Sequence, residues 1–161
     1  MIPLFALFEF TDYLDGHYAR KNGEVSDFGK LFDPFADVML NLTMFLCAQA
    51  SVTGRRYMPL IIFLFILYRE FGMNFLRMIT LKNGIAIAAR KGGKLKTVFY
   101  IISGFYVLTL ESAYRLGIAL PVSGALLNNI ALGMFIMCLC LSYISFIDYL
   151  VHFVFIVKSD M

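Results

Sequence analysis

The sequence predicts an all-α integral membrane protein, and two features of the chain lead to that fold class. Hydrophobic residues make up 60% of the 161 residues and charged residues only 16%, with a mean hydropathy of +0.78. A soluble domain of this size could not bury so much apolar surface. The apolar residues also fall into runs near the roughly 20 residues that a helix needs to span a bilayer. No repeat or low-complexity segment divides the chain, so we expect one membrane domain over residues 1–161.

Five apolar runs give the predicted spanning helices in chain order. The first, near residues 1–20, lacks the basic segment of a secretory signal and leads into acidic residues, so we expect a membrane helix there. The second and third, near residues 30–53 and 57–80, are apolar apart from a few charged side chains. The fourth and fifth lie near residues 95–117 and 123–157. Short polar loops such as residues 21–28 and 82–93 separate the runs, which predicts five spanning helices.

The loops differ in basic charge, and this difference predicts the orientation. Lys and Arg accumulate on the cytoplasmic side of membrane proteins. One side has nine basic residues, namely Arg20, Lys21, Lys30, Lys82, Arg90, Lys91, Lys94, Lys96 and Lys158, and the other has three, namely Arg55, Arg56 and Arg115. We therefore predict a multi-pass protein of the cell inner (cytoplasmic) membrane, with the nine-residue side in the cytoplasm. The small net charge of +3 is spread over separate loops, so no nucleic acid partner is expected.

Four aspartates interrupt this apolar pattern between residues 12 and 37, namely Asp12, Asp15, Asp33 and Asp37. Their spacings of three and four residues place each pair on one face of a helix. Carboxylates are costly in lipid, so the set needs a cation or another partner. Oxygen ligands of this kind suit Mg²⁺ or Mn²⁺, and four carboxylates could hold two ions. The sequence predicts a metal site in a helical cleft that opens toward the cytoplasm, and a cation pathway or proton relay is the alternative.

The aspartates belong to a pattern of eight residues within residues 12–37. The eight are Asp12, Asp15, Gly16, Ala19, Arg20, Gly29, Asp33 and Asp37. This pattern resembles the signature of the CDP-alcohol phosphatidyltransferase family, and every defining position is matched. The resemblance implies an enzyme that moves a phosphatidyl group from CDP-diacylglycerol onto an alcohol and releases CMP at a metal site.

The same resemblance implies roles for these residues and a parent fold. Asp12, Asp15 and Asp33 would be metal ligands, and Asp37 would be the general base and could also touch a metal. The residues that would bind the CDP-lipid are Gly16, Ala19, Arg20 and Gly29. Members of the family usually have six spanning helices, so this chain is expected to begin within the second of them and to be N-terminally truncated. Members are often homodimers, and the apolar last helices would suit such an assembly.

Four basic residues further along predict the acceptor alcohol. Arg69 and Arg77 lie in an arginine-glutamate segment, and Lys94 and Lys96 lie in a Gly-Lys-x-Lys-Thr element. Both segments resemble those of bacterial phosphatidylglycerophosphate synthases. An acceptor that already carries a phosphate needs cations, so glycerol 3-phosphate is the predicted acceptor. The alternatives are inositol phosphate or phosphatidylglycerol as acceptor, a truncated relic without activity, and a structural ion pair between Arg69 and Glu70.

Overall fold

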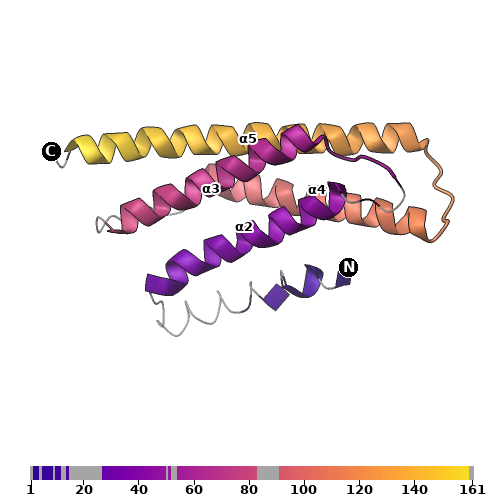
Figure 1. The fold of residues 1–161 in the computed structure, drawn as a ribbon, viewed down its shortest axis with the longest axis horizontal. Coiled ribbons are helices and arrows are strands. Elements are labelled where there is room, and N and C mark those ends of the chain that lie inside the picture. The colour runs from indigo at the N-terminus through magenta and orange to yellow at the C-terminus, as the bar shows by residue number, and fades with distance from the viewer. Residues whose placement is uncertain are drawn as a thin grey trace.

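Four long helices form the main part of the protein (Figure 1). They are α2 (Asp27–Gln49), α3 (Leu60–Lys82), α4 (Lys91–Arg115) and α5 (Gly124–Ser159). The computed structural model describes residues 2–3, 5–8, 10–11, 14, 27–49, 51, 54–82 and 91–159, but not the side chains of residues 27–31, 33, 81, 82, 91 and 154–159. Every regular element among the described residues is a helix, which confirms the predicted all-α class.

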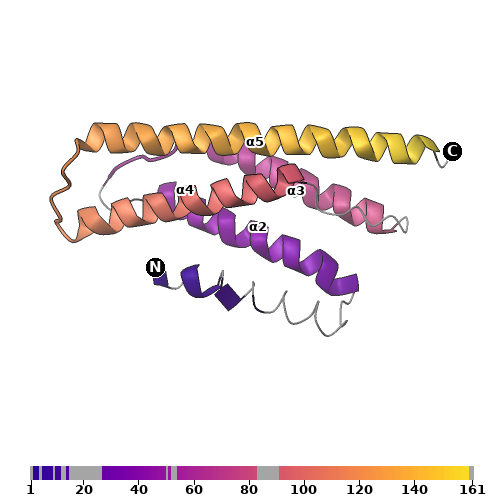
Figure 2. The same cartoon turned by 180° about the vertical axis from the view of Figure 1, so that it is seen from behind.

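The four helices are arranged as a ring in the order α2, α3, α5, α4. Helices α3 and α4 each pack against both α2 and α5. Within the described residues, no Cα atom of α3 lies within 8 Å of one in α4, and α2 and α5 are separated in the same way. Figures 1 and 2 show α5 along one side of the bundle and α2 on the opposite side, with α4 between them. Helices α3 and α4 therefore face each other diagonally, so only long side chains can join them.

Local signals set both ends of the turn between α4 and α5. Gly117 has a φ of 66°, its N–H donates to the Tyr114 carbonyl, and the Ile118 N–H donates to the Ala113 carbonyl. This is the Schellman motif, in which glycine takes the left-handed conformation after the last helical turn. Ser123 then caps α5, because its Oγ accepts a hydrogen bond from the Leu126 N–H at 3.4 Å.

Aromatic and small residues pack the centre of the bundle. The ring of Phe45 on α2 lies 5.0 Å from that of Tyr100 on α4 and 5.1 Å from that of Phe135 on α5, measured between centroids. All three side chains are buried. Where α2 crosses α4, a Cβ atom at Gly104 would overlap the Sδ of Met44. The glycine therefore allows the two helices to approach closely.

A buried carboxylate secures the loop between α2 and α3. The side chain of Glu111, near the end of α4, accepts hydrogen bonds from Ser51 Oγ at 2.7 Å, Tyr57 OH at 2.9 Å and Arg115 Nε at 3.0 Å. The guanidinium of Arg55 stacks on the ring of Tyr114, 3.9 Å from its centroid. Because Glu111 is only 7% exposed, its partners supply the hydrogen bonds that water would otherwise make.

Two of the described helical segments are long and apolar enough to cross a membrane, namely Gly92–Arg115 and Gly124–Phe153. Helix α3 carries Arg69, Glu70 and Arg77, which lower its apolar character. The last four of the five predicted apolar runs coincide with α2, α3, α4 and α5. The described residues of the first run, which are 2–3, 5–8, 10–11 and 14, are helical. With 36 residues, α5 is about 54 Å long, well above the roughly 30 Å of a bilayer core.

Candidate active site

A cavity of about 370 Å³ lies beside the first turns of α4, where it faces the middle part of α2 and α3. All four helices contribute to its wall: Pro34, Asp37 and Val38 from α2, Arg69, Glu70, Met73 and Arg77 from α3, Gly93, Lys94, Lys96, Thr97 and Val98 from α4, and Ser145 and Tyr149 from α5. The structure thus brings together five of the predicted site residues, which are Asp37, Arg69, Arg77, Lys94 and Lys96.

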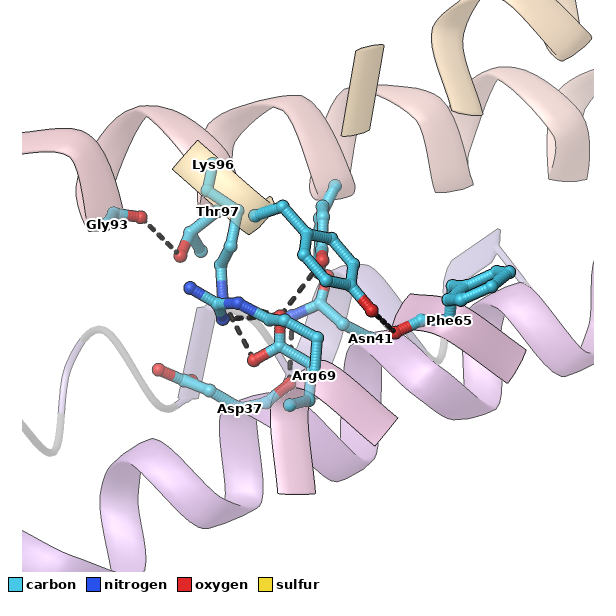
Figure 3. Close-up of polar contacts among 10 residues, drawn as sticks. Asp37, Asn41, Phe65, Arg69, Gly93, Lys96 and Thr97 are labelled. Atoms are coloured by element: carbon cyan, nitrogen blue, oxygen red, sulfur yellow. Dashed lines mark hydrogen bonds and ion pairs between the residues drawn. The ribbon is translucent and has the colours of Figure 1, made fainter. Parts of the chain in front are cut away.

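Asp37 reaches this cavity from the third turn of α2, where its side chain is half-buried. One turn later, the Asn41 side chain donates a hydrogen bond from Nδ2 to the Asp37 carbonyl oxygen at 2.8 Å (Figure 3). Pro34, one turn earlier, has no N–H to donate, so α2 lacks one backbone hydrogen bond beside the cavity. The predicted general base therefore lies between a turn of α2 that lacks a backbone hydrogen bond and a turn that gains a side-chain hydrogen bond.

Glu70 joins α3 to α4 within the cavity wall. Its Oε1 accepts hydrogen bonds from Arg69 Nη1, Lys96 Nζ and Tyr100 OH, each at 2.9 Å, and its Oε2 accepts a second one from Lys96 Nζ at 3.0 Å. Figure 3 shows Arg69 and Lys96 reaching toward each other from the two helices. Glu70 is 1% exposed. The ion pair considered from the sequence is thus present, and it includes Lys96 as well as Arg69.

The cavity wall carries more positive than negative charge. Four lining residues are basic (Arg69, Arg77, Lys94 and Lys96) and two are acidic (Asp37 and Glu70), which leaves an excess of two positive charges. Within the described part of the chain, neither Arg77 nor Lys94 forms an ion pair. The Nε of Arg69 is buried and has no hydrogen-bond partner among the described residues. Such a wall suits an anionic ligand such as a phosphate.

The other predicted site residues lie wholly or partly outside the described residues. Asp12, Asp15, Gly16, Ala19 and Arg20 are outside, and for Gly29 and Asp33 only the helical backbone of α2 is described. Gly29, Asp33 and Asp37 follow one another at intervals of four residues, so they share one face of α2. Among the described residues, no three His, Cys, Asp or Glu side chains come together to hold a metal ion. Of the four predicted metal ligands, the structure therefore describes the side chain of Asp37 and the backbone of Asp33.

Sequence reasoning did not assign site roles to Glu70 or Tyr100. Tyr100 lies four residues after Lys96, so both side chains share a face of α4, and this spacing was the available local signal. Glu70 follows Arg69 directly in the sequence, and nothing local indicates that its main partner is Lys96 on another helix. Ser145 and Tyr149 are likewise four residues apart, so they share a face of α5, and both line the cavity.

Comparisons with known proteins test the family that the sequence resembles. The profile of a family described as CDP-alcohol phosphatidyltransferase matches residues 2–136. The chain is 41% identical over 157 residues to the CDP-diacylglycerol–glycerol-3-phosphate 3-phosphatidyltransferase of Treponema pallidum, covering 98% of this chain and 71% of that protein. It is 34% identical over 128 residues to the protein of the same name in Rickettsia typhi, covering 80% of this chain and 69% of the relative.

A third relative of that name, from Bacillus subtilis, is 36% identical over 101 residues, covering 62% of this chain and 50% of that protein. No solved structure matches the chain. The family profile covers most of the chain and includes both Asp37 and the basic residues of the cavity. The family predicted from the aspartate pattern is thus confirmed, and the chain belongs to the CDP-alcohol phosphatidyltransferase family.

Proposed function

We propose that this protein transfers a phosphatidyl group from CDP-diacylglycerol to glycerol 3-phosphate, giving phosphatidylglycerophosphate and CMP. The observation that carries the proposal is the cavity that Asp37 and the basic side chains Arg69, Arg77, Lys94 and Lys96 line together. The names of the relatives from Treponema pallidum and Rickettsia typhi support the same donor and acceptor.

The basic side chains bind the phosphate of the acceptor. Glycerol 3-phosphate is an anion at neutral pH, and the excess of two positive charges in the wall attracts it. Arg77 and Lys94 make no ion pair within the described chain, so their charges are available to the phosphate oxygens. The buried Arg69 Nε offers a further donor. Held in this way, the acceptor presents its terminal hydroxyl, the one farthest from the phosphate, toward the α2 side of the cavity, where Asp37 lies.

Asp37 acts as the general base in the transfer. Its carboxylate accepts the proton of the acceptor hydroxyl as the hydroxyl oxygen attacks the phosphorus of the phosphatidyl group. A new bond forms between that oxygen and the phosphorus. The bond from the phosphorus to the oxygen that bridges it to the cytidylate breaks at the same centre, and the electron pair leaves with CMP. Placement of the acceptor by the basic wall and of the base on α2 makes the reaction effectively intramolecular.

The donor set of the aspartate pattern fits divalent cations. Asp12, Asp15, Asp33 and Asp37 would hold Mg²⁺ or Mn²⁺, as one or two ions, because carboxylate oxygens are the ligands that these hard ions prefer. When bound, the ions would neutralise the negative charge that builds up on the phosphate oxygens. Gly16, Ala19, Arg20 and Gly29 would contact the cytidine and pyrophosphate of the lipid.

The excess of basic residues in the loops on one side of the membrane also orients the protein. Lys94 and Lys96, which line the cavity, belong to that side, so the active site opens to the cytoplasmic side of the inner membrane. CDP-diacylglycerol lies in the bilayer with its headgroup at the surface, whereas glycerol 3-phosphate is soluble. A cavity beside the first turns of α4, where Lys94 is exposed, is accessible to both.

Release of CMP from CDP-diacylglycerol by the purified chain in detergent tests the proposal. The assay is run with and without glycerol 3-phosphate, with and without Mg²⁺ or Mn²⁺, and with inositol phosphate or phosphatidylglycerol as competing acceptors. We expect release only when both a divalent ion and glycerol 3-phosphate are present. Release with another acceptor alone would overturn the acceptor assignment, and no release with any acceptor would favour an inactive relic.

A further inference from the structure

The buried acidic residue of the cavity wall, Glu70, has no role in the transfer described above. We infer that Glu70 is a positioning residue, which holds Arg69 of α3 and Lys96 of α4 at the places where they meet the acceptor phosphate. This inference rests on the proposed function, because it assigns a part of the glycerol 3-phosphate site.

The contacts of Glu70 support this role directly. One carboxylate accepts four hydrogen bonds of 2.9 to 3.0 Å, two of them from Lys96 and one each from Arg69 and Tyr100. The side chains of Arg69 and Glu70 are each 2% exposed and that of Lys96 is 11% exposed. Charge-assisted hydrogen bonds in such a buried place are strong and directional. Glu70 therefore determines where both basic groups lie.

The helix arrangement makes this link necessary. Helices α3 and α4 lie diagonally across the bundle, and no Cα atoms of the two come within 8 Å in the described residues. No direct backbone packing between α3 and α4 therefore places Arg69 beside Lys96. Two buried positive charges side by side repel each other, and the carboxylate between them removes that repulsion. Without it, the flexible Lys96 side chain would turn away from Arg69.

Glu70 leaves part of this basic pair available to a ligand. Arg69 donates to Glu70 through Nη1, whereas its Nε is buried and has no partner in the described residues. Arg69, Glu70 and Lys96 together carry one net positive charge, from two bases and one acid. Both bases also line the cavity that Asp37 enters. The carboxylate thus fixes the guanidinium and ammonium groups without cancelling their attraction for an anion.

Positioning and simple charge compensation predict opposite results, which makes the inference testable. If Glu70 only reduced the positive charge of the wall, its neutralisation would strengthen the binding of an anionic acceptor. If Glu70 positions the bases, its neutralisation weakens that binding even though the wall becomes more positive. Glu70→Gln tests this difference, because glutamine keeps the size of the side chain and one acceptor oxygen but not the charge.

The experiment measures CMP release by the full chain while glycerol 3-phosphate and CDP-diacylglycerol are varied separately. For Glu70→Gln we expect the KM for glycerol 3-phosphate to rise about tenfold, as on loss of a charged partner, with the KM for CDP-diacylglycerol changed less than about twofold. Glu70→Asp, which keeps the charge, should show a smaller rise. In a Lys96→Met background, Glu70→Gln should change the KM for glycerol 3-phosphate less than in the wild type, because the two side chains act as one unit.

Glu111→Gln is the matched control, because Glu111 on α4 is a second buried carboxylate with a tyrosine partner, Tyr57, and a basic partner, Arg115. It lies about 22 Å along the helix from Lys96, so both variants should lower the melting temperature but only Glu70→Gln should change the KM for glycerol 3-phosphate. A lower KM in Glu70→Gln, or a loss of thermal stability with unchanged KM, would overturn the inference. Absence of glycerol 3-phosphate-dependent release by the wild-type chain would overturn the proposed function itself, and the inference with it.

Discussion

At the residue scale, the chemistry proposed for the cavity depends on Asp37 and on the four basic residues that line the cavity with it. Asp37 is the residue of the aspartate pattern that the structure places in the cavity wall with Arg69, Arg77, Lys94 and Lys96. The acid comes from α2 and the bases from α3 and α4, so proton removal and phosphate binding are assigned to different helices. Each proposed role can therefore be tested by a variant of its own.

The carboxylate of Asp37 can be removed without a large change in shape by Asp37→Asn. We expect kcat to fall by about 10²-fold to 10⁴-fold, which is the usual contribution of a general base. The protein should stay folded and should still be stabilised against thermal unfolding by CDP-diacylglycerol, which checks that the donor still binds. Turnover close to that of the wild type would show that Asp37 is not the base.

Lys94 is exposed at the cavity and makes no ion pair in the described chain, so its charge can act on the acceptor. In Lys94→Ala, we expect the KM for glycerol 3-phosphate to rise by about tenfold, with kcat changed much less, through the loss of one charge-assisted hydrogen bond. The difference from the wild type should shrink at high salt, where exposed charges are screened. Arg56→Ala, an exposed base at the other end of the bundle, is the control and should leave the KM unchanged.

At the element scale, the crossing of α2 and α4 positions Asp37 relative to the bases of α4. Gly104 allows the close approach at this crossing, and Met44 of α2 fills the space beside it. Met44 is 1% exposed, so its side chain has little room to move. Further along the chain, the Gly117 turn and the Ser123 cap set where α4 ends and α5 begins. The packed crossing supports the site from within the bundle, while these local signals define the helix ends.

Substitution of Gly104 by alanine tests the importance of this crossing. The added methyl group overlaps Met44, and overpacking of this kind costs about 1–3 kcal/mol, which exceeds the stabilisation of about 1 kcal/mol that alanine brings to a helix. We expect a lower melting temperature, measured in detergent. Gly133→Ala on α5 is the control, since a Cβ there meets nothing within 4 Å, and it should be neutral or stabilising. Equal effects of the two substitutions would argue against a close crossing.

At the scale of the whole molecule, the two ends of α4 lie in chemically different surroundings. The cavity with its four bases lies where α4 begins, and the Glu111 cluster with Arg55 and Arg115 lies where α4 ends. The apolar segments Gly92–Arg115 and Gly124–Phe153 connect the two ends. In a bilayer, the two ends would face opposite compartments, so the basic cavity and the Glu111 cluster would lie in different aqueous phases.

Labelling of single cysteines with a membrane-impermeant maleimide tests this orientation in intact cells. The background has Cys47, Cys138 and Cys140 replaced by alanine, and the two reporters are Asn83→Cys and Ala119→Cys. By the positive-inside rule, we expect Ala119→Cys to react in intact cells and Asn83→Cys to react only after permeabilisation. The reverse pattern would place the active site on the outer face.

The sequence by itself determined the helical class, the family and most of the candidate residues of the site. Long apolar runs predict helices because their backbone groups must bond within the segment in lipid, and four of the runs coincide with α2, α3, α4 and α5. Asp33 shares a helix face with Asp37, and Lys96 shares one with Tyr100, because residues four apart are neighbours on the surface of a helix. The basic residues Arg69, Arg77, Lys94 and Lys96 could be selected from motifs alone.

Only the tertiary structure decided which of these residues meet. Two sets of hydrogen bonds join segments that are far apart in the sequence. They are those of Glu70 with Lys96 and Tyr100, and those of Glu111 with Ser51 and Tyr57. Such contacts arise from how the helices pack, and helical periodicity carries no information about a partner on another helix. For the same reason, the sequence indicated an ion pair of Arg69 with Glu70 as an alternative, but not that Glu70 also binds Lys96 of another helix.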